Sequence, residues 1–240
     1  MADRVSTSAD PLVPTAPWRN DAIASNGSAV RDNFAAWFNG SALTNDDGEP
    51  YVVYRGDKKS VDVFHQDERR EFGLFFAVEE ERAKYYGQAQ AYVLRGKNVL
   101  DLRDAYGQWR KGGPAAEIIE SIFEDHLAGT HCEESGDPLT LSDAITAIEE
   151  GFLWRLDGTG GWRMHAWRDL QRLVHASGFD ALIVHDDGEG GGKGLDVIVF
   201  EADQVKLAYG NSGLFSSESP SVSDGSIESD YQQPRERPRA

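Results

Sequence analysis

Two short segments contain residue types that could bind a phosphate or a metal ion. Residues 188–194 read GEGGGKG, and a phosphate-binding loop would need a glycine five residues before its Gly-Lys pair and a serine or threonine after the lysine. Asp187 and Gly194 occupy those two positions, so we interpret the segment as a flexible hairpin loop. Residues 131–134 (HCEE) include metal-ligand types, but no second cluster has matching spacing, which favours a solvated loop and no metal site.

Other chemically capable side chains lie at the ends of predicted elements. Arg55 follows an apolar strand, and Asp196 begins another one. Tyr85 and Tyr86 close a helix and point in different directions, so we expect one of them to pack against the fold. Each group taken singly has an ordinary structural explanation, as a surface ion pair, a core ring or a carboxylate at a strand start.

Composition limits the classes of function. The 240 residues carry 24 basic and 41 acidic side chains, a formal charge of −17 that disfavours broad binding to nucleic acid or an anionic membrane. One cysteine, Cys132, excludes an internal disulfide framework. No apolar stretch approaches a bilayer span and no signal peptide is evident. We therefore expect a cytoplasmic protein, or one secreted by a route that needs no signal peptide.

The chain divides into three parts by composition. Residues 1–28 show no sustained periodicity and are predicted to form a disordered arm. Residues 211–240 contain eight serines and are predicted to be a disordered tail, because such a segment buries too little apolar area to offset chain entropy. Residues 29–210 would then form one domain.

Within this domain, strand and helix patterns alternate. Strands are predicted at 51–54, 72–76, 91–95, 99–102, 181–185 and 196–200, and helices at 28–38, 79–86, 114–127, 142–150 and 164–174. Short strands separated by helices, with a tight connection between the last two strands, favour an α+β fold with a largely antiparallel sheet.

Three blocks appear in order along this pattern: residues 51–56 (YVVYRG), 73–77 (GLFFA) with 83–86 (AKYY), and 196–205 (DVIVFEADQV). Together they resemble the ADP-ribosyltransferase superfamily, in particular the domains of phage polyvalent proteins and bacterial toxins, which are similar to the diphtheria-toxin and poly(ADP-ribose) polymerase group. The resemblance implies split antiparallel β-sheets with flanking helices, and a helical insert at about 105–160.

The resemblance also assigns positions. Arg55 stands where the phage-type group has histidine and where another toxin branch has arginine, and Gly56 follows it as expected. An ungapped count from the second block places the family tyrosine at Tyr86, whereas a one-residue gap would select Tyr85. Asp196 stands where the family has glutamate, one methylene longer.

In that family NAD⁺ is the substrate and no metal is required. The resemblance implies that Asp196 binds the ribose 2′-hydroxyl and stabilises the cation that forms as the glycosidic bond breaks. Tyr86, or Tyr85, would stack on the nicotinamide ring, with Arg55 contributing to catalysis through the dinucleotide.

The same resemblance implies three further contacts with NAD⁺. Arg55 would donate to a phosphate or to the adenosine ribose. Gly56 would pair its backbone with the nicotinamide carboxamide. Phe75 or Phe76 would form the wall opposite the tyrosine, and because they alternate along a strand, one of them should face the core.

The implied function is transfer of ADP-ribose to a macromolecular acceptor, expected to be a protein, by a monomeric bacterial toxin, effector or phage-derived modifier. A nucleic acid acceptor stays open, and no membrane partner is expected. The replacement of glutamate by Asp196 keeps two alternatives open: NAD⁺ hydrolysis, and a degenerate domain that binds ADP-ribose or a protein without chemistry.

Overall fold

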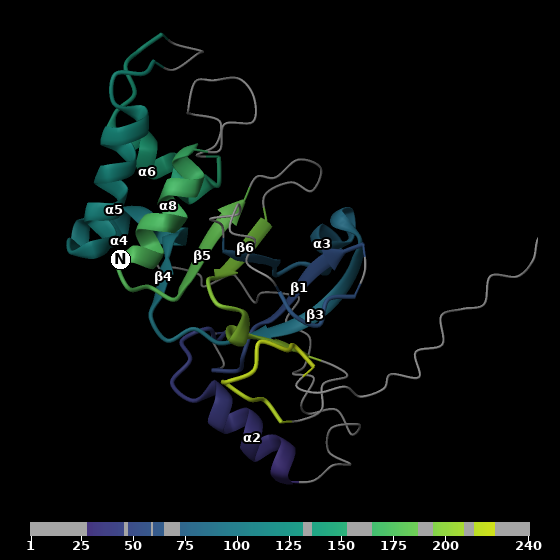
Figure 1. Ribbon diagram of the computed structural model, residues 1–240. Helices are drawn as coiled ribbons and strands as arrows, with labels where there is room; N and C mark the ends of the chain where they lie inside the picture. Colours follow the sequence, from purple (N-terminus) through teal and green to yellow (C-terminus); the bar gives the residue numbers. More distant parts are fainter. Residues whose placement is uncertain are drawn as a thin grey trace, which may run out of the picture.

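The computed structural model describes residues 28–45, 48–58, 60–64, 73–131, 136–152, 165–186, 194–208 and 214–223. The helices are α2 (Ser28–Phe38), α3 (Glu80–Tyr86), α4 (Ala105–Lys111), α5 (Pro114–Ile122), α6 (Leu141–Glu150) and α8 (His165–Ala176), with short turns η2 (Leu102–Asp104), η3 (Phe123–Leu127) and η4 (Ala202–Gln204). The strands are β1 (Val52–Asp57), β2 (Leu74–Ala77), β3 (Gln88–Leu94), β4 (Val99–Asp101), β5 (Ala181–Asp186), β6 (Gly194–Val199) and β7 (Val205–Leu207) (Figure 1).

The strands form one seven-stranded sheet in the order β4-β5-β6-β2-β1-β3-β7. Only β4 and β5 run parallel, and every other neighbouring pair is antiparallel. The predicted α+β class is therefore confirmed. β3 is longer than predicted, because its polar first half, Gln88–Gln90, continues the ladder with β1.

The sheet is almost divided between β1 and β2, which share the single backbone pair Tyr54↔Ala77. The buried Gln204 side chain donates one hydrogen bond to the Arg95 carbonyl after β3 (2.8 Å) and another to the Asp180 carbonyl before β5 (2.9 Å). In strand order β5 is second and β3 is sixth, so the two halves must fold toward each other to share this side chain.

An inner core fills the space between the two halves. It combines residues of β1, β3 and β7 with residues of β2, β5 and β6, and its buried members are Leu43, Val53, Phe64, Leu74, Phe76, Tyr92, Leu94, Ala181, Ile183, Val197, Val199, Val205 and Val222. Burial of this apolar area from both halves supplies the main stabilisation of the split arrangement.

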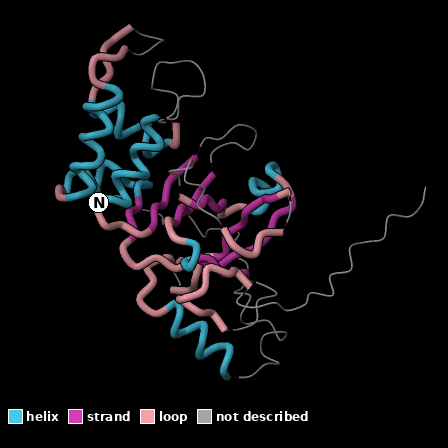
Figure 2. Tube along the Cα trace, viewed as in Figure 1, coloured by secondary structure: helices cyan, strands magenta, loops and turns pink. Residues whose placement is uncertain are grey.

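Helices α4, α5, α6 and α8 gather on the outer face of the half-sheet β4-β5-β6-β2 (Figures 1 and 2). Helices α4, α5 and α6 lie within the stretch predicted to be a helical insert, of which residues 132–135 and 153–164 lie outside the described part. Pro114 occupies the first turn of α5, and a capping box between Thr140 and Asp143 begins α6. α4 was not predicted, since its sequence AYGQWRK has no apolar stripe.

At the opposite end, α2 packs on the half-sheet β1-β3-β7 (Figure 1). Phe34 and Trp37 of this helix meet Phe215, whose ring centroid lies 5.0 Å from that of Phe34 in an edge contact. The structure thus differs from the predicted disorder of residues 211–240, because the described part of that stretch, 214–223, contributes Phe215 and Val222 to the core.

A buried lysine holds this C-terminal segment in place. Lys206 of β7 donates hydrogen bonds from Nζ to the carbonyls of Ser219 (3.0 Å) and Ser221 (2.7 Å). Leu207 and Asp62 pair through their backbones with Val222. The segment therefore adds backbone contacts to β7 as well as apolar surface.

No helix in the described ranges is long and apolar enough to cross a bilayer. Residues 188–193 of the glycine-rich segment, the arm before Ser28, and Cys132 lie outside those ranges, whereas Gly194 is described as the first residue of β6.

Replacing Phe215 by alanine should lower the free energy of unfolding by about 3 kcal/mol, because a buried aromatic ring is lost and a cavity is left beside α2. Leu214→Ala is the matched control: Leu214 is 60% exposed against 6% for Phe215, so we expect a change below about 0.5 kcal/mol. Equal, small effects in urea denaturation would show that this segment does not belong to the fold.

Candidate active site

Helix α3 lies directly on the end of strand β1. A Cβ atom placed on Gly56 would meet the Ala83 carbonyl oxygen at 1.8 Å, so only glycine allows the strand and helix backbones to approach this closely. Ala83 is the buried residue of α3. Gly56 therefore serves helix packing on its Cβ side, and its predicted pairing with a carboxamide stays a prediction.

One row of residues crosses the sheet at the point where the halves separate. Tyr54 of β1 pairs with Ala77 of β2, Ala77 with Asp196 of β6, and Asp196 with Val184 of β5. Paired residues share a face of the sheet, so Asp196 and Tyr54 lie on the same face about 10 Å apart. This places the start of β6 beside the split.

Asp196 is buried, at 8% exposure, and its partner is a cation from α3. Arg82 approaches the Asp196 Oδ1 atom with its Nη2 atom at 3.4 Å, and the same Nη2 donates to Asp186 Oδ2 at 2.8 Å. Its Nη1 donates to the Asp186 carbonyl at 2.9 Å. One guanidinium thus joins α3 to the ends of β5 and β6.

Three carboxylates surround this one guanidinium. Glu79 accepts a hydrogen bond from the Leu195 backbone and, with Asp186, adds negative charge near Asp196. Burial, together with these two carboxylates, raises the pKa of Asp196 to about 7, although Arg82 acts in the opposite direction. The Arg82 pKa is raised by the same carboxylates despite its burial. The site carries excess negative charge, suited to a cationic group.

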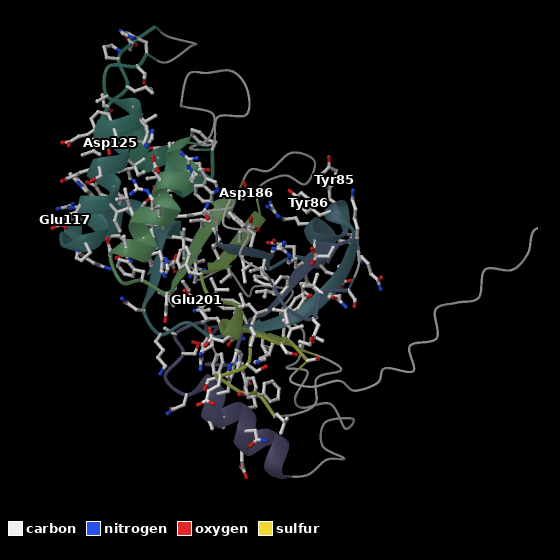
Figure 3. All side chains as sticks on the ribbon, viewed as in Figure 1. Tyr85, Tyr86, Glu117, Asp125, Asp186 and Glu201 are labelled. Carbon is white, nitrogen blue, oxygen red and sulfur yellow. The ribbon has the colours of Figure 1, made fainter. Side chains whose placement is uncertain are left out.

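The two tyrosines extend from the end of α3 and are both exposed, 63% for Tyr85 and 59% for Tyr86 (Figure 3). Their rings meet edge to face with centroids 5.3 Å apart. Partial burial and the charges of Asp186 and Asp196 raise the pKa of Tyr86. Tyr86, four residues after Arg82 on α3, is therefore the tyrosine coupled electrostatically to the carboxylates.

Arg55 points to the other face of β1. Its guanidinium carbon lies 5.2 Å from the Phe64 ring centroid and 5.9 Å from that of Phe76, both in the inner core. Nε donates to Asp57 and Nη1 to the Phe75 carbonyl at 3.2 Å. Because Gly56 would face Phe75 if the β1–β2 ladder continued, Arg55 bridges the split at this point.

The two phenylalanines of β2 divide between the faces as their alternation predicts. Phe76 is a core residue at 1% exposure, packed edge to face with Phe64 and Tyr92. Phe75 shares the face of Asp196 and is only partly buried, with Trp167 of α8 6.5 Å away between ring centroids. Of the two, Phe75 is the ring that lies on the Asp196 face.

The site residues on one face are thus Asp196, Tyr86 and Phe75, with the backbone of Gly56 beside them, and Arg55 lies on the other. Residues 45–215 match the family model ART-PolyVal, described as ADP-ribosyltransferase in polyvalent proteins. The chain belongs to this ADP-ribosyltransferase family.

A further likeness is weak. A solved structure titled as the crystal structure of an anti-CRISPR protein shares 15% identity, covers 62% of this chain and 88% of its own, and has a TM-score of 0.30. No curated protein matches the sequence.

Sequence reasoning gave no role to Arg82, Glu79 or Asp186. In this ADP-ribosyltransferase the Arg82-to-Tyr86 spacing of four residues places both on one side of α3, which was the available signal. It was obscured because Glu80, Glu81 and Lys84 of the same helix form exposed ion pairs. Among the described residues, no cluster of histidine, cysteine and carboxylate side chains could hold a metal ion.

The raised pKa of Asp196 makes the stability of this ADP-ribosyltransferase domain depend on pH. The folded state holds the proton up to about pH 7, whereas an unfolded aspartate releases it near pH 4, so stability is lost as pH rises between these values. Asp196→Asn removes this loss. We expect the variant to gain about 2–4 kcal/mol relative to wild type between pH 4.5 and pH 8. Parallel stability curves in chemical denaturation would contradict the shift.

Proposed function

We propose that this domain transfers ADP-ribose from NAD⁺ to a macromolecular acceptor, most simply a protein. The observation that carries the proposal is a buried carboxylate, Asp196, at the split of a family-matched sheet, with an exposed tyrosine, Tyr86, electrostatically coupled to it. We further propose that it acts as a bacterial toxin, effector or phage-derived modifier, a setting suggested by the match to ADP-ribosyltransferases of polyvalent proteins.

The reaction breaks the bond between the ribose C1′ and the nicotinamide nitrogen. The bonding electron pair leaves with nicotinamide, which becomes neutral, and positive charge develops at C1′. A new bond then forms between C1′ and the acceptor nucleophile, which gives up a proton. An enzyme gains rate by placing negative charge near C1′ in the transition state.

Asp196 supplies that charge. Within the described part of the chain its carboxylate accepts one hydrogen bond, at Oδ1 from Arg82, which leaves Oδ2 for the ribose 2′-hydroxyl. Asp196 is one methylene shorter than the family glutamate, and the ribose must approach β6 correspondingly closer. The carboxylate must be ionised to do this work, so the rate of NAD⁺ cleavage should rise with pH through about 7 in the free enzyme.

Tyr86 and Phe75 are two of the aromatic residues on the Asp196 face, and we assign them to the nicotinamide ring. A cationic pyridinium over a tyrosine face gains about 0.5–2 kcal/mol. Arg55 is held by Asp57 and by the Phe75 carbonyl, so binding a phosphate requires it to exchange these partners. Its contribution to NAD⁺ binding remains part of the proposal.

NAD⁺ labelled on the adenosine side tests the function directly. Label transferred to a protein of a lysate supports the transferase, and mass spectrometry identifies the acceptor. Release of nicotinamide with all label left as free ADP-ribose would indicate hydrolysis instead, and intact NAD⁺ would indicate a binding domain.

Asp196→Ala should lower the turnover of NAD⁺ by about a hundredfold or more, with the fold retained. Wild-type turnover in that variant would remove Asp196 from its role.

The two tyrosines should differ in effect. Tyr86→Ala should raise the Michaelis constant for NAD⁺ by about tenfold, since it removes the ring coupled to Asp186 and Asp196. Tyr85→Ala, the matched control one residue away, should change it by less than about twofold. Steady-state kinetics decide the matter, and the reverse ranking would select Tyr85 as the family tyrosine.

A further inference from the structure

We propose that Arg82 of α3 is a positioning residue of the transferase, which fixes the Asp196 carboxylate at the start of β6 and keeps it charged for the reaction. The inference rests on the proposed function and extends it to a residue outside the three blocks by which the sequence resembles its family.

The first argument is geometric. The Arg82 guanidinium is held at three points, by Asp186 Oδ2 (2.8 Å), the Asp186 carbonyl (2.9 Å) and Asp196 Oδ1 (3.4 Å). A planar guanidinium held at three points has a single orientation. The carboxylate that it contacts is therefore restrained at one oxygen, while the other is left for substrate.

The second argument is the path that the fold leaves for this side chain. Arg82 passes over Gly194, where a Cβ atom would lie 2.3 Å from Cδ and 2.4 Å from Nη1 of the arginine. Gly194 pairs with Asp186 across the β5–β6 ladder. Glycine at the first residue of β6 thus opens the route by which a residue of α3 reaches both aspartates.

The third argument is charge balance around Asp196. From the α3 side it is faced by Arg82, Tyr86 and Glu79, and from β5 by Asp186; His185 lies on the opposite face of β5. Of these, Arg82 is the group that lowers the pKa of Asp196, whereas burial, Asp186 and Glu79 raise it. Without Arg82 only the influences that favour the neutral acid would remain, and Asp196 would be protonated at neutral pH.

A purely structural role is the alternative, in which Arg82 ties α3 to the sheet and its loss merely loosens the fold. The two roles differ in pH dependence. A structural ion pair changes stability and lowers activity equally at every pH. A positioning role moves the pH at which activity appears, since it acts through the ionisation of Asp196.

The test measures nicotinamide release from NAD⁺ by the full chain between pH 5.5 and pH 9.5. In wild type, kcat/KM should rise with a midpoint near pH 7. In Arg82→Met the midpoint should move above about pH 8, and kcat/KM at pH 7 should fall by about tenfold and recover in part at pH 9. Arg82→Lys, which keeps the cation, should return the midpoint toward that of wild type.

Two further variants separate position from charge and from folding. Gly194→Ala changes no charge but displaces Arg82, and it should move the midpoint upward as Arg82→Met does. Lys84→Met removes a cation from the exposed face of the same helix, where it pairs with Glu80 and Glu81, and should leave the profile unchanged. A wild-type midpoint in Arg82→Met overturns the inference.

A readout without turnover keeps the two proposals distinguishable. The Asp196 carboxyl carbon, identified by its loss in Asp196→Asn, can be titrated by ¹³C NMR in folded wild type and in Gly194→Ala. An upward move of its midpoint in the variant supports the role of Arg82, and an unchanged midpoint opposes it. Wild-type protein that leaves NAD⁺ intact refutes the proposed function, whereas active protein with an unmoved Arg82→Met profile refutes the positioning role alone.

Discussion

Strands β1 and β2 share one backbone pair, Tyr54 with Ala77, and the candidate site is built around the place where their ladder stops. Beyond this pair β1 and β2 no longer form a backbone ladder with each other, and other groups contact their backbones instead. Arg55 donates to the Phe75 carbonyl on one side of β1. On the other side the backbone of α3 lies against Gly56, so closely that no side chain fits between them. The interrupted ladder thus brings a helix, with its charged and aromatic side chains, to the edge of β6.

The charges at this edge of the sheet are unbalanced in a manner that suits the proposed chemistry. Three carboxylates, Glu79, Asp186 and Asp196, share one buried guanidinium. A fold selected only for stability would pair them more evenly, because a buried carboxylate with excess anionic neighbours is costly to ionise. The cost is sensible where a positively charged pyridinium and a developing cation are to be bound, since both would restore the balance.

Much of the fold was accessible from sequence, because apolar periodicity and capping residues determine most of its elements. Pro114 begins a helix where expected, α6 begins one residue before the predicted start, and the alternation of Phe75 and Phe76 correctly divided them between two faces. Asp196 was selected as the candidate carboxylate through the order of the blocks. Its partner Arg82 was not predicted, because an arginine among the exposed charges of α3 is typical of a solvated helix face. Only the register of β5 and β6 shows which carboxylates Arg82 contacts.

Local composition also hid the C-terminal contribution. A single aromatic residue, Phe215, within a serine-rich segment gives no periodic signal, and its burial depends on α2 almost two hundred residues earlier. Tertiary contacts rather than local sequence determine whether such a residue is buried. The same holds for the buried ammonium of Lys206, whose carbonyl partners belong to a segment without regular structure.

The contact between Phe34 and Phe215 has an architectural consequence. It joins the first helix of the described fold to the last described segment, so these two parts of the chain are neighbours. A domain whose two ends lie close together can be inserted into a loop of another protein with little disruption of that protein's fold, because the two ends of the interrupted loop stay close together. The described fold meets this geometric condition for insertion into a multidomain protein.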